Sequence, residues 1–555
     1  MRFSTSVARV ATAAAILFTT NVHALQKVTR AGRYLYTDDG NRFYIKGIAY
    51  QPQGITSNDP NNPFPEPSSF TDPLADSAGC ARDIPFLKQL SVNAIRVYSV
   101  NSSLNHDSCM QALSAAGIYT ILDLSIPLNG SIDRSNPAWT TNLLDLYLTT
   151  IDVFSKYDNI LAYNIGNEVI VNSNGTVAAP YIKAAARDVK AYLTSKNLQG
   201  LVGYAAIDQS ADLLVPLANY LSCDSNTDSI DLFGLNNYEW RGDSTFEASY
   251  AGVEGAFAGY NVAAYFSEFG SVTKPPRLWT EVQALFSDQM SPVWSGGLAF
   301  SYFPAESGDG EFGMVTISGN TVTPNADFTR LVAQYGKVSA PTTPSKSDAG
   351  AGTYPSCPAA NSTWLASTTL PPTPDDTACA CAVSNLSCQF TPQTTNTTAI
   401  VGQLIDAACS SLGGAGGNCN DIGGSGSAGT YGRFSYCDPN SKLSFIMTEF
   451  YEITNRNAQS CNFAGNATVN KNAPSSVSAV NAAVAQCLSK SQATHTPSAP
   501  STPAATGGSS GGGGGGSPST PKSSSAALGR AGFEGALGIG AMLVACVVGG
   551  MWTLV

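Results

Sequence analysis

The strongest constraint on the fold is a repeated alternation of strand-like and helix-like segments across residues 27–340. Short apolar runs that end in polar residues predict buried strands, and longer segments with helical spacing predict helices between them. We expect strands at 43–50, 94–98, 119–124, 160–169, 201–206, 230–238, 260–270 and 297–303, and helices at 81–90, 109–116, 142–157, 181–195, 250–259 and 281–290. Eight strands with intervening helices predict an α/β fold, a (β/α)₈ barrel with its active site at the carboxyl ends of the strands.

Two of these predicted strands end in a glutamate. The fourth carries Asn167 and Glu168 at its end, and the seventh carries Glu268. Either glutamate alone could be an ordinary strand-end residue that faces water. Two carboxyls on the same rim of a barrel, however, form the pair that glycosidases use to break a glycosidic bond. The pair therefore favours an enzyme that acts on sugars.

Composition excludes several other classes of function. The formal net charge of −11 and the pI of about 4.8 disfavour a nucleic-acid partner, which needs a basic face. His23, His106 and His495 are the three histidines, too few for a His-rich metal site or a Ser-His-Asp triad. We therefore expect no metal and no cofactor, with carboxylates and tyrosines moving the protons.

The two ends of the chain predict an exported, membrane-attached protein. A basic start, a short apolar core and small residues before the cleavage point predict a signal peptide. The apolar end predicts a glycosylphosphatidylinositol (GPI) signal with attachment at Ser524 or Ser525, and a tail-anchored helix is the alternative. The predicted parts are a signal peptide 1–24, a barrel domain 25–340, a linker 341–376, a cysteine-rich domain 377–490, a Ser/Thr/Pro/Gly-rich stalk 491–524 and a GPI-attachment propeptide 525–555.

The cysteines and sequons agree with export. The cysteine-rich domain is expected to contain four disulfides whose pairing the sequence leaves open. Its eight cysteines are Cys379, Cys381, Cys388, Cys409, Cys419, Cys437, Cys461 and Cys487. The expected N-glycosylation sites are Asn101, Asn129, Asn174, Asn361, Asn385, Asn396 and Asn466. The Cys379-x-Cys381 spacing could also suggest a metal or redox site, but export favours structural bridges.

Several motifs, in order along the chain, resemble a known family. They are Tyr44–Gln51, Ile95–Tyr98, Leu122–Leu124, Tyr163–Val169, Gly234–Trp240 and Phe266–Gly270. Residues 27 to about 340 thereby look like fungal β-1,3-glucanosyltransferases of glycoside hydrolase family 72. The cysteine-rich part is similar to the glucan-binding module of one branch of that family, through Tyr431–Cys437 and Lys442–Phe445.

The resemblance implies a retaining mechanism with Glu168 as acid/base and Glu268 as nucleophile. It also implies a glucan cleft and two disulfides, Cys80–Cys109 and Cys223–Cys357. The cleft residues implied are Gln51, Tyr98, Asp123, Asn167, Tyr238 and Tyr302. Relatives often carry a Tyr-x-Tyr pair where this chain has Phe300-Ser-Tyr302.

The function expected is elongation of wall β-1,3-glucan by transfer between a donor and an acceptor chain. An endo-β-1,3-glucanase and an inactive glucan-binding wall protein are the alternatives. The protein is expected to be a monomer that is secreted through the ER and reaches the outer face of the plasma membrane and the cell wall. In the small domain, the residues expected either to stack on sugars or to pack in its core are Tyr431, Phe434, Tyr436 and Phe445.

Overall fold

The computed structural model describes residues 25–54, 69–127, 130–489 and 495–499. The predicted signal peptide, the propeptide with Ser524 and Ser525, and the sequon at Asn129 lie outside the described residues. The stalk also lies outside them except for residues 495–499. None of the helices in the described ranges is long and apolar enough to cross a bilayer.

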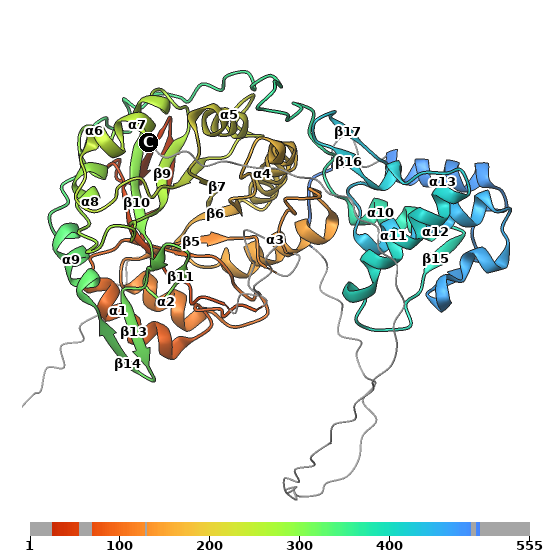
Figure 1. Ribbon diagram of the computed structural model, residues 1–555, viewed down its shortest axis with the longest axis horizontal. Coiled ribbons are helices and arrows are strands. Elements are labelled where there is room, and N and C mark those ends of the chain that lie inside the picture. The colour runs from red at the N-terminus through yellow and green to blue at the C-terminus, as the bar shows by residue number, and fades with distance from the viewer. Residues whose placement is uncertain (1–24, 55–68, 128–129, 490–494, 500–555) are drawn as a thin grey trace, which may run out of the picture. The chain divides into compact units, whose positions relative to one another are not determined.

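The described residues contain eight strands that close into a parallel barrel surrounded by helices, which confirms the predicted fold (Figure 1). In barrel order the strands are β3 (Ile45–Ala49), β4 (Ala94–Val97), β5 (Tyr119–Asp123), β6 (Ile160–Asn167), β7 (Leu201–Ile207), β8 (Leu232–Asn236), β9 (Ala263–Phe269) and β10 (Trp294–Ala299). Strand β10 pairs with both β9 and β3, which closes the ring. Glu168 therefore directly follows the fourth barrel strand, β6, and Glu268 lies at the end of the seventh, β9.

The helices that cover the barrel are α1 (Ser77–Gln89), α2 (Asp107–Ala115), α3 (Thr141–Phe154), α4 (Ala179–Ser195), α5 (Ala211–Leu221), α6 (Phe246–Ser249), α7 (Ala251–Ala256), α8 (Glu281–Leu285) and α9 (Ala326–Tyr335). Sequence patterns did not predict α5 or α9. Helix α5 contains Pro216, which normally interrupts a helix. Helix α9 begins at Asn325, whose side chain accepts hydrogen bonds from the backbone N–H groups of Asp327 and Phe328.

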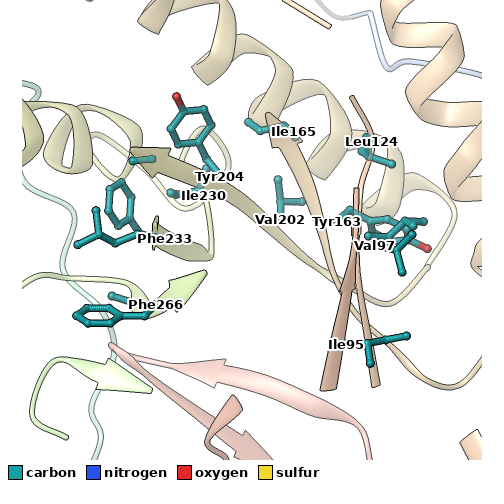
Figure 2. Close-up of a cluster of buried hydrophobic side chains, with 14 of the residues drawn as sticks. Ile95, Val97, Leu124, Tyr163, Ile165, Val202, Tyr204, Ile230, Phe233 and Phe266 are labelled. Atoms are coloured by element: carbon teal, nitrogen blue, oxygen red, sulfur yellow. The ribbon is translucent and has the colours of Figure 1, made fainter. Parts of the chain in front are cut away.

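Side chains alternate between two cores along each strand. Ile95 and Val97 on β4 and Phe233 on β8 point outward into the layer between strands and helices (Figure 2). Ala94 and Leu232 belong to a second cluster, built from strand residues and from Leu35 of the β1–β2 hairpin (Val28–Ala31 and Tyr34–Thr37). This alternation is the period of two that a strand imposes. It leaves Arg96 pointing inward, between two outward-facing apolar neighbours.

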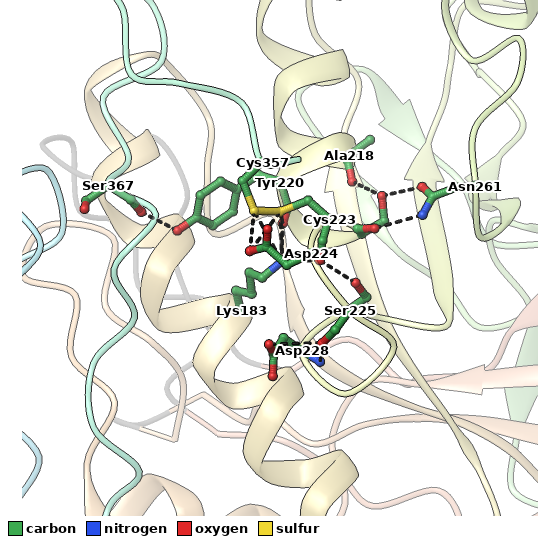
Figure 3. Close-up of a disulfide and its surroundings, with 12 residues drawn as sticks. Lys183, Ala218, Tyr220, Cys223, Asp224, Ser225, Asp228, Asn261, Cys357 and Ser367 are labelled. Atoms are coloured by element: carbon green, nitrogen blue, oxygen red, sulfur yellow. Dashed lines mark hydrogen bonds between the residues drawn. A yellow bond between two sulfur atoms is a disulfide. The ribbon is translucent and has the colours of Figure 1, made fainter. Parts of the chain in front are cut away.

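Residues 341–376 have the composition of a linker, but they lie along the barrel. Trp364 is fully buried in the barrel's outer core, and Thr373 donates a hydrogen bond to Asp188 on α4. The Cys223–Cys357 disulfide joins this segment to the residues after α5 (Figure 3). Beside it, Lys183 donates to the backbone oxygen of Cys223 at 2.8 Å, and burial lowers the pKa of Lys183 to about 8. A buried tryptophan and a disulfide thus fix a segment that its composition predicts to be free.

The cysteine-rich domain packs helices α10 (Asp376–Ser384), α11 (Thr398–Gly414), α12 (Pro439–Ile453) and α13 (Val477–Ser489) around two small cores. A short pair, β15 (Cys388–Phe390) and β18 (Ala467–Val469), completes it. Its four disulfides are Cys379–Cys437, Cys381–Cys487, Cys388–Cys461 and Cys409–Cys419. In the barrel, Cys80 pairs with Cys109, so both barrel bridges have the pairing that the resemblance implies.

Candidate active site

The candidate site lies at the carboxyl ends of the barrel strands. Side chains from β4, β5, β6, β8 and β9 and from the residues that follow them meet there. They are Arg96, Tyr98, Asp123, Asn167, Glu168, Asn236, Tyr238 and Glu268. Parallel strands bring their carboxyl ends to one rim, so residues far apart in sequence become neighbours.

An irregularity in strand pairing lies just before each glutamate. Between β6 and β7, the register advances three residues on β6, from Asn164 to Asn167, but only two on β7. Between β8 and β9 it advances two residues on β9, from Phe266 to Glu268, and one on β8. An extra residue of this kind bends a strand and changes the direction of the side chain that follows. Both glutamates thus leave the simple in–out alternation.

Glu168 also has an unusual backbone. Its φ angle is +50°, in the left-handed region that non-glycine residues rarely adopt. Its N–H donates to the Ala205 oxygen at 2.8 Å, and its own carbonyl oxygen accepts from Arg134 Nε at 3.0 Å. These two bonds hold the turn, which fits the general finding that such conformations persist at functional sites.

Three donors hold the carboxylate of Glu268. Tyr98 Oη donates to Oε1 at 2.8 Å, and Tyr238 Oη donates to Oε2 at 2.7 Å. Arg96 Nη1 lies 3.3 Å from Oε1. The Glu268 residue is 8% exposed. A carboxylate held on both oxygens has one orientation, which is what attack on a single carbon requires.

Burial raises the pKa of Glu268 to about 7. The positive charge of Arg96 lowers it, the charge of Glu168 raises it further, and the hydrogen bonds from Tyr238 and Tyr98 lower it again. Repulsion between the two carboxyls therefore contributes, but burial is the largest cause.

Arg96 connects the strands at the centre of the site. It is fully buried and makes a bidentate ion pair with Asp123, with Nη2 to Oδ2 at 2.7 Å and Nε to Oδ1 at 3.1 Å. The same Nη2 donates to Asn167 Oδ1 at 2.9 Å. Its guanidinium lies 4.2 Å from the centroid of the Tyr98 ring. A buried cation with these partners is compensated, and it fixes every residue it touches.

Asn236 connects the acid pair from the other side. Its Nδ2 donates to Glu168 Oε1 at 2.7 Å and lies 3.2 Å from Asn167 Oδ1. Its Oδ1 accepts from Ser267 Oγ at 2.7 Å. The residue is 2% exposed. Glu168 is thus oriented by an amide that the barrel interior itself holds in place.

Three residues implied as cleft residues have other partners. Gln51 Oε1 accepts from the backbone N–H groups of Tyr98 and Ser99, so it shapes the loop after β4. Asp123 lines the cleft, but both its oxygens pair with Arg96. The cleft role expected of Tyr302 is corrected: this residue is fully buried, donates to Asp83 at 3.0 Å and does not line the cavity beside Glu168. The chain leaves the sheet after Ala299, which turns Tyr302 into the core.

Phe300 packs against two tyrosines of the site. Its half-buried ring makes edge contacts with Tyr98 and Tyr238, with 6.4 Å between ring centroids in both cases. A cavity of about 350 Å³ opens beside this group and is lined by Tyr98, Asp123, Ser131, Asn167 and Glu168, among others. The volume is in the range of small ligand sites.

Sequence reasoning missed Arg96 and Asn236. One signal for the first was a charged residue in the middle of an apolar strand, Ile95-Arg96-Val97, since a buried charge needs a partner. Asn236 carried a weaker signal, because it stands beside Asn237 in an otherwise apolar strand. Elsewhere in the described residues, Cys223, Asp224 and Cys357 have the spacing of a metal site. Both of these cysteines are in a disulfide and cannot bind a metal as thiolates.

The chain is similar to several known proteins. Residues 14–339 match a family model described as glucanosyltransferase, and residues 386–468 match the X8 domain. The chain is 40% identical to 1,3-beta-glucanosyltransferase gas1 of Schizosaccharomyces pombe over 442 residues, which cover 79% of this chain and 78% of that protein. It is 38% identical over 439 residues to 1,3-beta-glucanosyltransferase GAS2 of Saccharomyces cerevisiae, with 77% of each covered.

A solved structure is similar across both folded domains. It is Gas2p of Saccharomyces cerevisiae, a glutamate-to-glutamine mutant, in complex with laminaritetraose and laminaripentaose. The TM-score is 0.72 and the sequence identity is 35%, with 83% of this chain and 99% of that one covered.

Proposed function

The chain belongs to the glucanosyltransferase family, glycoside hydrolase family 72, and on this premise we propose how its own site works. It cleaves β-1,3-glucan internally and transfers the new reducing end to the non-reducing end of a second glucan chain. One observation carries this proposal: Tyr98, Tyr238 and Arg96 all hydrogen-bond the carboxylate of Glu268. Asn236 connects Glu168 to the same network.

In the first step, an oxygen of Glu268 attacks the anomeric carbon of the donor. The bond from that carbon to the leaving glycosidic oxygen breaks, and Glu168 gives its proton to the leaving oxygen. The products are a glycosyl ester on Glu268 and a glucan fragment that departs. The amide of Asn167 is placed to hydrogen-bond the 2-hydroxyl, an interaction that strengthens as the ring becomes oxocarbenium-like. Asp123 keeps Arg96 in position during this step.

In the second step, a hydroxyl of the acceptor chain attacks the same carbon. Its proton passes to the carboxylate of Glu168, the ester bond breaks, and Glu268 returns as a carboxylate. Two inversions give net retention. Transfer competes with hydrolysis when the acceptor is held in attack geometry, since well-oriented reactants reach effective molarities of about 10⁵ M or more. The half-buried Phe300 and the ring of Tyr98 offer apolar faces for that purpose.

The cellular setting is part of the proposal. The parts 1–24, 25–340, 341–376, 377–490, 491–524 and 525–555 act as signal, catalytic domain, connecting segment, cysteine-rich domain, stalk and lipid-attachment propeptide. Lipid attachment at Ser524 or Ser525 places a monomeric enzyme at the outer face of the plasma membrane and in the cell wall. The sequons at Asn101, Asn174, Asn361 and Asn396 are exposed, as glycan attachment requires.

The test is the size of the products. A soluble form of the ectodomain is incubated with one defined laminari-oligosaccharide, and the products are separated by length. Transfer gives products longer than the substrate. Shorter products alone would identify a glucanase, and no products would identify a binding protein. Glu168→Gln and Glu268→Gln serve as controls, and each should abolish transfer while leaving the fold intact.

A further inference from the structure

A second, larger cavity lies where the barrel meets the cysteine-rich domain. Its volume is about 920 Å³, at the upper end of the range for ligand sites. On the barrel side it is lined by the segment from Ser131 to Leu143 and by Tyr181 on α4. On the other side it is lined by α11, by the turn at 422–424 and by the start of α12. The two domains together thus form a site that neither contains alone.

Two buried hydroxyls on the wall of this cavity call for a partner. Tyr181 Oη and Ser435 Oγ have no hydrogen-bond partner within the described ranges. The two residues are only 3% and 8% exposed. A Cβ on Gly424, which also lines the cavity, would lie 2.7 Å from Tyr181 Oη, so this hydroxyl is at the cavity wall. Leaving a buried hydroxyl unpaired is unfavourable, and a hydroxylated ligand would supply the missing hydrogen bond.

The remaining lining has the chemistry of a site for a neutral, hydroxyl-rich ligand. Asn136, Asn142 and Asn440 supply amides that can both donate and accept. The charged residues of the lining are Asp133, Asp438 and Lys442. Two carboxylates against one ammonium disfavour an anionic ligand such as a phosphate. Sugars fit this set of groups.

One loop lines both this cavity and the catalytic cleft. Ser131 lines both. The residues after it alternate, with Ile132 and Arg134 on the cleft and Asp133 and Asn136 on the cavity. A polymer that fills the cleft is therefore led along this loop towards the second cavity.

Three of the four aromatic side chains that the sequence offered for stacking on sugars, Phe434, Tyr436 and Phe445, do not form a sugar platform. Phe434 and Phe445 are buried and stacked on each other, with 4.4 Å between ring centroids, and Tyr436 is 1% exposed. Tyr431 donates its hydroxyl to the Thr369 oxygen and packs on Tyr181. Phe434, Phe445 and Tyr436 therefore pack in the core of the domain, which is one of the two roles that the sequence left open.

We propose that the cavity between the domains binds a further stretch of the same β-1,3-glucan chain that occupies the cleft. The cysteine-rich domain then acts by lengthening the cleft, so that long chains are preferred over short ones. This inference rests on the proposed transfer reaction, because it names additional sugar subsites for it.

A blocking substitution tests the inference. Gly402 on α11 lines the cavity, and a Cβ added there meets no atom within 4 Å. Gly402→Phe should therefore place a ring in the cavity without displacing its walls. Gly413→Phe is the matched control, since Gly413 is on the same helix, is equally open and does not line the cavity. Equal melting temperatures of the two variants would show that both fold.

The measurement is kcat/KM with short laminari-oligosaccharides and with long soluble laminarin. Gly402→Phe should lower kcat/KM for long chains on the order of tenfold, the loss of about 1.4 kcal/mol of binding, and leave short chains unchanged. Gly413→Phe should change neither. Wild-type behaviour of Gly402→Phe, or an equal loss for both lengths, would overturn the proposal.

A binding experiment separates this idea from the reaction itself. With Glu268→Gln as background, retention of long laminarin should weaken when Gly402→Phe is added and remain when Gly413→Phe is added. Equal retention in both would overturn the cavity proposal. If the wild-type protein makes no products that are longer than the substrate, the proposed reaction is wrong. The binding comparison still tests the cavity proposal in that case.

Discussion

Removing one hydroxyl from the nucleophile's environment tests the central geometry. In Tyr238→Phe, Glu268 loses the donor to Oε2 at 2.7 Å but keeps Tyr98 and Arg96 on Oε1. A hydrogen bond to a charged group contributes about 1.5–3 kcal/mol, so kcat/KM for transfer should fall roughly 10- to 150-fold at neutral pH.

The pH profile should change in a defined direction. The tyrosine hydroxyls lower the pKa of Glu268, which burial raises to about 7. Without one of them the pKa rises further, so a smaller fraction is ionised at pH 7. Because Glu268 must be ionised to attack, the ascending limb of kcat/KM should move to higher pH, and part of the lost activity should return there.

The assay is transfer of a defined laminari-oligosaccharide from pH 4 to 9. Tyr98→Phe should behave in the same way, since it removes the donor to the other oxygen. Tyr147→Phe is the control, because its buried hydroxyl donates to the Ile165 backbone oxygen at 3.0 Å and not to the site. A profile for Tyr238→Phe that keeps its midpoint, whatever the rate, would refute the assigned role of this hydroxyl.

Three further outcomes are expected. Asn236→Ala removes the 2.7 Å donor to Glu168, the proposed acid/base, and should lower kcat/KM by roughly 10- to 100-fold with little change in KM, whereas an unchanged kcat would contradict the positioning role. Replacing Cys223 and Cys357 by serine opens a bridge across 134 residues and should lower stability by about 2–4 kcal/mol, read as Tm. Burial and the carboxyls of α10 and of the residue before α12 raise the pKa of Asp145 to about 7. Between about pH 4 and pH 7, Asp145 is then protonated in the folded protein but ionised in the unfolded chain. The free energy of unfolding should therefore fall as pH rises through this range, and Asp145→Asn should flatten the corresponding slope of Tm against pH.

The sequence predicted the course of the backbone more completely than the contacts of the side chains. The barrel, the positions of its strands and the two glutamates on one rim follow from local patterns, because the period of apolar residues and the polar residue at a strand end are read within a few positions. The same local patterns assigned a linker to residues 341–376. They could not show that Trp364 would be buried against the barrel or that Cys357 would pair with a cysteine 134 residues away.

The contacts inside the site required the tertiary structure. An extra residue in β6 and in β9 changes which way the glutamates point, and no period of two predicts where such a residue falls. Arg96 and Asn236 bind partners on other barrel strands, and these partners are 27 to 172 residues away in the sequence.

The sequence alone determined the barrel and the rim on which both glutamates lie, since these depend on residue type and on spacing along one segment. Only the tertiary structure decided that Tyr302 is buried, that Gln51 holds a loop and that a cavity opens between the two domains. The physical reason is that the direction and the partners of a side chain depend on which distant strands close the ring beside it.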